Sequence, residues 1–225
     1  MKLEDKIVLA HSGHACSKSK KIYKENSIEA CRESSEKDYI DIIELDLRKS
    51  KDGILYCYHG TAIQYNLTLK LSRNFPNIEV NYKVDRLDDI LDIIPKHKVV
   101  FLDIKDTSIT KEEILKSFKK RDFKEIMIGN KSVSYLSKFN GLPKEFVKII
   151  NGNIFCNFYN LSKLKNNGYR YFEVVFPFQV YTKIIKKVEK NGLEFRISGL
   201  FFLSKESYWK KIDRYNIKYI SSDFI

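Results

Sequence analysis

Eight short apolar runs recur along the chain, and segments of helical character separate them. The runs begin near residues 6, 40, 99, 125, 146, 171, 195 and 218. Strands that alternate with helices are parallel, because each helix returns the chain to the starting end of the sheet. Eight such units predict an α/β fold, a compact (β/α)8 TIM barrel that is short for its class. The eighth run lies at the end of the sequence, so we expect no final closing helix.

The segments between these runs indicate where the helices lie. Helices are expected at 27–37, 87–94, 111–120, 132–139, 161–166, 180–190 and 205–215. A further extended run is expected at 54–58 after a KDG turn, and residues 60–83 are polar and irregular. We see no linker and no internal repeat, which favours a single domain over residues 1–225. A doubly wound open sheet is the alternative, but no glycine-rich phosphate loop follows the first run.

The sequence is basic, with a formal net charge of +12 over 225 residues. Such a charge suits an anionic substrate, a nucleic acid or an acidic membrane surface. The lysines are spread along the whole chain, however, and isoleucine and asparagine are abundant too, which favours a compositional bias. Because the RNP, KH and zinc-finger patterns do not occur in the sequence, we expect no nucleic-acid partner.

Cysteine spacing and hydropathy bear on the compartment. The four cysteines form no CxxC pair, which predicts reduced thiols rather than a zinc site or a disulfide framework. No apolar run reaches the 18 residues of a membrane helix, and the first residues do not resemble a signal peptide. We therefore expect a cytoplasmic protein without stable membrane insertion. The oligomeric state stays open.

Ionisable side chains occur where the first apolar runs end. Glu44 and Asp46 are two residues apart in one run, so their side chains point to one face of the strand. The full set at run ends is His11, Glu44, Asp46, His59, Asp103 and Lys105. Active sites of parallel barrels lie at the C-terminal ends of the strands. We therefore expect these six residues to converge at the mouth of the barrel.

The residue types in this set indicate a chemistry. Three buried carboxylates, Glu44, Asp46 and Asp103, need a compensating charge, and a divalent metal, Mg²⁺ or Ca²⁺, is the simplest partner. His11 and His59 beside it are suited to general acid and base roles.

Several segments resemble motifs of the glycerophosphodiester phosphodiesterase family in order and spacing. They are AHSG, ENSIEA, IELDLRKSKDGILYCYHG, VVFLDIK and the terminal YISSDF. The resemblance covers nearly the whole chain and implies a (β/α)8 barrel that hydrolyses a small phosphodiester in lipid metabolism with a divalent metal. It implies that Glu44, Asp46 and Asp103 are metal ligands. It also implies that His11 and His59 form the acid/base pair and that Lys105 lies near the phosphate.

Three positions depart from the family pattern. Ser12 replaces an arginine, Gly60 replaces an aspartate, and Asp103 replaces a longer glutamate. Loss of the arginine removes a bidentate phosphate clamp. We therefore expect Ser12 in the substrate site, with Lys20 or Lys21 of the long 14–24 segment as the replacement cation.

Two questions remain open at this point. The phosphodiester can be a glycerophosphodiester, a phospholipid head group, or a glycan- or nucleotide-linked diester. A catalytically decayed barrel that binds phosphorylated ligands is the alternative function. Glu173, inside an apolar run, faces either the lumen or a helix.

Overall fold

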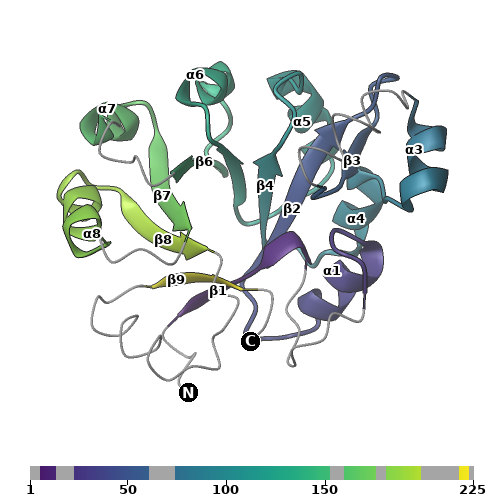
Figure 1. Ribbon diagram of the computed structural model, residues 1–225, viewed down its shortest axis with the longest axis horizontal. Coiled ribbons are helices and arrows are strands. Elements are labelled where there is room, and N and C mark those ends of the chain that lie inside the picture. The colour runs from purple at the N-terminus through teal and green to yellow at the C-terminus, as the bar shows by residue number, and fades with distance from the viewer. Residues whose placement is uncertain are drawn as a thin grey trace.

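Eight parallel strands close into a barrel in the computed structural model, which describes residues 6–13, 23–60, 74–152, 160–175, 181–198 and 218–222. Around the barrel the order is β1, β9, β8, β7, β6, β5, β4 and β2, and β2 pairs again with β1. Figure 1 shows the helices outside the ring of strands, so the expected (β/α)8 barrel is confirmed. The strands are β1 (Ile7–Ala10), β2 (Ile42–Lys49), β4 (Val99–Ile104), β5 (Ile126–Asn130), β6 (Phe146–Gly152), β7 (Tyr169–Val175), β8 (Glu194–Ser198) and β9 (Tyr219–Ser222).

The described helices begin within one residue of the expected positions, with one addition. The expected helix at 205–215 and the chain after Ser222 lie outside the described residues. Within the described part, no helix combines the length and hydropathy needed to cross a bilayer. The helices are α1 (Ile28–Ser35), α3 (Phe75–Tyr82), α4 (Leu87–Ile93), α5 (Lys111–Phe118), α6 (Val133–Leu136), α7 (Leu161–Asn166) and α8 (Tyr181–Lys190), with 3₁₀ turns η1 (His11–Gly13) and η3 (Ser137–Phe139).

Polar caps start several of these helices. The side chains of Ser27, Ser132 and Asn160 each accept a hydrogen bond from a backbone N–H in the first turn of the helix that follows. Thr110 does the same and forms a capping box with Glu113. Such caps satisfy backbone donors that a helix start leaves unpaired, and each stabilises its helix by about 1 kcal/mol.

Residues 75–82 form α3, although the sequence predicted an irregular segment there. The backbone N–H of Phe75 donates to both carboxylate oxygens of Asp52, at 2.9 and 3.1 Å. Asp52 belongs to the turn before β3 (Leu55–Cys57), which pairs antiparallel with β2. Phe75 and Ile78 of the helix pack with Tyr56 in a separate small core. The start of α3 is therefore stabilised by a carboxylate that lies outside the helix in the sequence.

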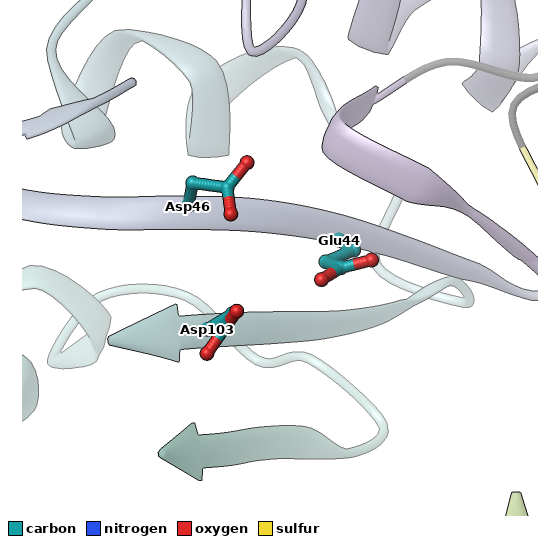
Figure 2. A group of neighbouring side chains, drawn as sticks. All are labelled: Glu44, Asp46 and Asp103. Carbon is teal, nitrogen blue, oxygen red and sulfur yellow. The ribbon is translucent and has the colours of Figure 1, made fainter. Parts of the chain in front are cut away.

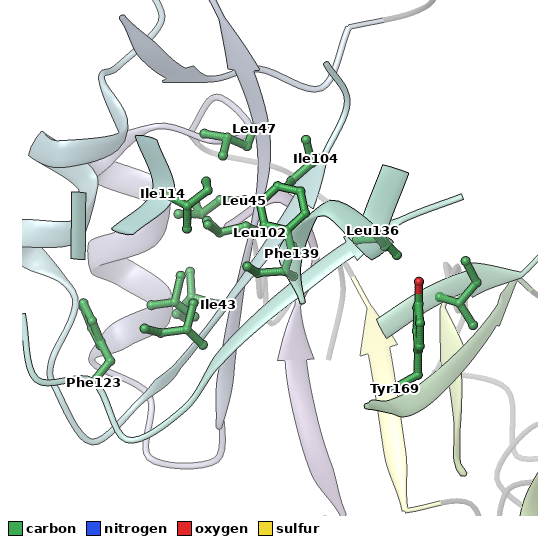
Figure 3. Close-up of a cluster of buried hydrophobic side chains, with 14 of the residues drawn as sticks. Ile43, Leu45, Leu47, Leu102, Ile104, Ile114, Phe123, Leu136, Phe139 and Tyr169 are labelled. Atoms are coloured by element: carbon green, nitrogen blue, oxygen red, sulfur yellow. The ribbon is translucent and has the colours of Figure 1, made fainter. Parts of the chain in front are cut away.

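Side chains of β2 alternate between two cores. Ile43, Leu45 and Leu47 face the outer core between the strands and the helices, which Figure 3 shows. Ile42 faces the lumen, where the apolar core consists of Leu9, Ile42, Phe101, Met127, Ile149, Tyr171 and Tyr219. The ring of Phe101 occupies the space above Gly129, because a Cβ there would lie 2.5 Å from the ring. The apolar lumen forms a floor beneath the polar residues at the C-terminal ends of the strands.

Candidate active site

Three carboxylates meet at the C-terminal mouth of the barrel. Glu44 and Asp46 project from β2, and parallel pairing places Asp103 of β4 beside Asp46. One oxygen from each of the three lies within 4.8 Å of the others. Figure 2 shows the three side chains gathered on the neighbouring strands β2 and β4. All three side chains are buried. The structure thus brings together the three residues that the sequence analysis selected as metal ligands.

This cluster fits a divalent cation. Burial raises the pKa of Glu44 to about 8, with attraction to His11 opposing the shift and repulsion from Asp46 adding to it. Burial also raises the pKa of Asp103, although the charge of Lys105 opposes that rise. Buried, mutually repelling carboxylate oxygens are stabilised by a hard cation, and oxygen donors are the ligands that Mg²⁺ and Ca²⁺ prefer.

Asp46 accepts three hydrogen bonds through a single oxygen. Its Oδ2 accepts from Ser12 Oγ at 2.7 Å and from Asn26 Nδ2 at 2.8 Å. His59 Nδ1 lies 3.0 Å from the same oxygen. Burial opposes ionisation of Asp46, but the hydrogen bond from His59 and the charge of Lys105 hold its pKa well below the usual value. Asp46 is therefore a fixed carboxylate, and its other oxygen, Oδ1, faces the Lys105 ammonium at 2.9 Å.

Lys105 is a cation inside the carboxylate cluster. Its Nζ forms an ion pair with Asp103 and lies 2.9 Å from Asp46 Oδ1, without hydrogen-bond geometry toward that oxygen. Burial acts against its charge, yet Asp103 and Asp46 together raise its pKa, so the ammonium group is retained. Asn151 Nδ2 holds the other oxygen of Asp103 at 2.8 Å. One fixed positive charge thus lies among the three carboxyl groups.

The two histidines of the set lie close together. His11 follows β1 and His59 follows β3, and their ring centroids are 5.8 Å apart in an edge-on arrangement. The His59 side chain is 43% exposed, so it can reach a ligand from the open mouth. Arg48 fixes the backbone there, with Nε donating to Tyr58 O and Nη2 to His59 O, both at 2.8 Å. Arg48 was missed by the sequence analysis, although it shares the face of Glu44 and Asp46 by the same alternation.

Ser12 is buried beside Asp46. Its side chain is fully buried, its backbone is left-handed (φ 49°, ψ 36°), and its hydroxyl donates to Asp46. Asn26, also with positive φ, donates its backbone N–H to Ser12 O at 2.7 Å. Such backbone costs energy for residues other than glycine, and here it aims two donors at Asp46. Lys20 and Lys21 lie outside the described residues.

A second ion pair lies deeper in the lumen. Arg196 of β8 is fully buried, and its Nε is 3.1 Å from Oε2 of Glu173 on the neighbouring strand β7. Its guanidinium lies 4.6 Å from the centroid of the Phe101 ring, which is part of the lumen floor. Glu173 thus faces the lumen, which resolves the alternative left open by the sequence. Arg196 was missed, although a lone arginine in the run EFRIS was a usable signal.

Comparison with known proteins agrees with this geometry. The sequence matches the glycerophosphoryl diester phosphodiesterase family over residues 15–196. No curated protein matches it significantly.

Solved structures share the fold. A glycerophosphodiester phosphodiesterase from Thermotoga maritima is 20% identical with a TM-score of 0.75, covering 97% of this chain and 94% of its own. The Agrobacterium tumefaciens enzyme is 17% identical with a TM-score of 0.70, covering 97% of both chains. An Oleispira antarctica phosphodiesterase, solved with the product sn-glycerol-3-phosphate, is 15% identical with a TM-score of 0.75, covering 97% and 93%. The chain belongs to the glycerophosphoryl diester phosphodiesterase family and is a phosphoric diester hydrolase.

Proposed function

We propose that the protein hydrolyses a glycerophosphodiester or a related phosphodiester with a divalent metal and the pair His11 and His59. The observation that carries the proposal is the double role of Asp46. Its Oδ2 holds His59 at 3.0 Å, while the same carboxylate belongs to the three-residue cation cluster. The product bound to the Oleispira antarctica relative supports the glycerophosphodiester class.

The metal ligands in this proposal are Glu44, Asp46 and Asp103, and the ion is Mg²⁺ or Ca²⁺. When bound, the cation neutralises the phosphate charge and polarises its oxygens. Lys105, held between Asp46 and Asp103, adds a second positive charge at the same place.

His59 is assigned the base. A carboxylate only accepts hydrogen bonds, so the contact with Asp46 places the His59 proton on Nδ1 and leaves Nε2 as an acceptor. Nε2 takes the proton of the attacking hydroxyl, from water or from a neighbouring substrate hydroxyl, as its oxygen bonds to phosphorus.

His11 is assigned the acid. Glu44 lies close enough to His11 for a charge on one group to act on the other. As the bond between phosphorus and the leaving oxygen breaks, His11 gives its proton to that oxygen, and the alcohol departs neutral. The 5.8 Å between the two ring centroids lets both groups act on one phosphate.

Substrate size is a further part of the proposal. The Ser12 hydroxyl donates its hydrogen bond to Asp46 and not to the phosphate. The cation that an arginine supplies in the family must therefore come from another residue. We assign it to Lys20 or Lys21, which predicts better turnover of substrates large enough to reach the 14–24 segment.

The test combines metal removal with histidine variants. Glycerophosphocholine and larger phosphodiesters are incubated with the chelated protein, and Mg²⁺ or Ca²⁺ is then restored. Activity is expected only with metal, and His11→Asn or His59→Asn is expected to lower the rate by about 10²- to 10⁴-fold. His97→Asn, at an exposed histidine between α4 and β4, is the matched control and leaves the rate unchanged. Full activity in excess chelator contradicts the metal assignment, and product binding without any turnover supports the decayed-barrel alternative.

A further inference from the structure

Arg196 is a buried cation that the proposed reaction does not use. Its side chain is fully buried, and its Nε and Nη2 have no hydrogen-bond partner within the described residues. The guanidinium contacts the Phe101 ring on one side and Met127 Sδ at 3.7 Å. Because an arginine cannot lose its proton, the site carries a permanent positive charge that needs a compensating negative one.

Glu173 supplies that negative charge and also lies near the metal cluster. It pairs with Arg196 through Oε2, and it is in register beside Asn151, whose Nδ2 donates to Asp103 Oδ1 at 2.8 Å. Its oxygens do not join the group of Glu44, Asp46 and Asp103 that can share one ion. Glu173 therefore lies near the cluster without supplying a ligand atom to it.

A balance of charges explains why the pair is retained. Within the described lumen, the carboxylates of Glu44, Asp46, Asp103 and Glu173 outnumber the cations of Arg48, Lys105 and Arg196. A divalent cation would compensate this excess of negative charge. A buried cluster is stable only near neutrality, so each of these charges affects the affinity for the metal.

We propose that Glu173, held in place by Arg196, is a positioning residue that tunes divalent-metal affinity by charge and not by ligation. The pair carries no net charge, so its two members together leave the charge at the metal cluster unchanged. This inference rests on the metal assignment of the proposed function.

Calorimetric titration with Ca²⁺ and Mg²⁺ tests it without reference to catalysis. Glu173→Gln leaves the Arg196 charge uncompensated and is expected to weaken metal binding by about 10- to 100-fold. The double variant with Glu173→Gln and Arg196→Met removes both charges and is expected to bind metal within about threefold of wild type. Glu173→Asp, which keeps the carboxylate, is the conservative control and retains most of the affinity. Arg196→Met alone leaves the Glu173 charge uncompensated and is expected to tighten metal binding about tenfold.

The outcomes separate three explanations. Unchanged metal affinity in Glu173→Gln and in Arg196→Met overturns the inference and leaves the pair a structural one. A double variant as weak as Glu173→Gln shows that Glu173 is itself a ligand, which also overturns it. If Glu173→Gln does not fold, Arg196→Met still tests the inference, because this variant is expected to bind the metal more tightly. A wild-type protein that binds neither metal refutes the metal site of the proposed function instead.

Discussion

The two mouths of the barrel carry charged clusters on different strands, and these clusters differ in burial and in charge balance. At the N-terminal mouth, Arg170 lies 2.7 Å from Glu125 and 2.8 Å from Glu194, and these side chains are 42%, 19% and 40% exposed. At the C-terminal mouth, Asp46 is fully buried in a cluster where carboxylates outnumber cations. The first arrangement is tolerated at little cost, and the second is costly unless a cation compensates its charge.

The comparison teaches how to separate structural charges from functional ones. An exposed ion pair contributes at most about 1 kcal/mol, because water screens the attraction. A buried excess of negative charge lowers stability, and a protein keeps it where a ligand supplies the missing charge. Geometry alone would not distinguish the two mouths, since both have ion pairs of similar length. Burial and charge balance distinguish them.

The largest expected effect comes from Asp46→Asn. The amide removes a metal ligand and the acceptor that orients His59, so phosphodiester hydrolysis is expected to fall by about 10³-fold or more. Glu125→Gln at the opposite mouth is the matched control, expected within about twofold of wild type. Rates are measured with saturating metal and glycerophosphocholine. Comparable losses from both variants would erase the distinction between the mouths.

Metal addition is expected to have the next largest effect. Ca²⁺ at about 100 times its Kd stabilises a protein that binds it only when folded by about 2.7 kcal/mol. For a chain of this length, that raises Tm by roughly 5–10 °C. The rise should vanish in Asp46→Asn and persist in Glu125→Gln, as followed by thermal unfolding with and without chelator. A rise that survives in Asp46→Asn would place the metal elsewhere.

Ser12→Ala is expected to have a smaller effect. Asp46 Oδ2 loses one of its three hydrogen-bond donors, and a lost bond of this kind costs about 1 to 1.5 kcal/mol, or about tenfold in kcat/KM. Ser134→Ala, at an exposed serine of α6, is the control. Ser12→Arg is expected to reduce the folded fraction, because position 12 is fully buried. Restored activity in Ser12→Arg would instead support a direct phosphate contact at this position.

The smallest effect concerns Glu194 and depends on pH. Burial raises its pKa, but hydrogen bonds from Tyr219 and Arg170 outweigh that and lower the pKa below its usual value. A carboxyl group with a lowered folded pKa stabilises the protein above its unfolded pKa, and that stabilisation is lost as the pH falls through the folded pKa. Wild type should therefore exceed Glu194→Gln by less than about 1 kcal/mol at pH 7, and the difference should be smaller at pH 3. Urea unfolding at both pH values measures it, and a difference that grows on acidification would contradict the assignment.

The sequence by itself determined the barrel and the composition of its mouth. The alternation of apolar runs and helices is a local pattern, and the strand starts were predicted within two residues of those observed. Side-chain alternation in β2 placed Glu44 and Asp46 on one face. The six strand-end residues followed from the same reasoning, because parallel strands end at one mouth.

Only the tertiary structure decided which groups pair with which. Ser12 Oγ meets Asp46 across 34 residues of sequence, and Asn26 meets it across 20. The start of α3 depends on Asp52, which lies 23 residues earlier. Arg196 and Glu173 become a pair only because β7 and β8 are neighbours in register. Periodicity records which face of an element is buried, but a hydrogen bond or an ion pair depends on the atoms that the closed barrel brings within about 3 Å.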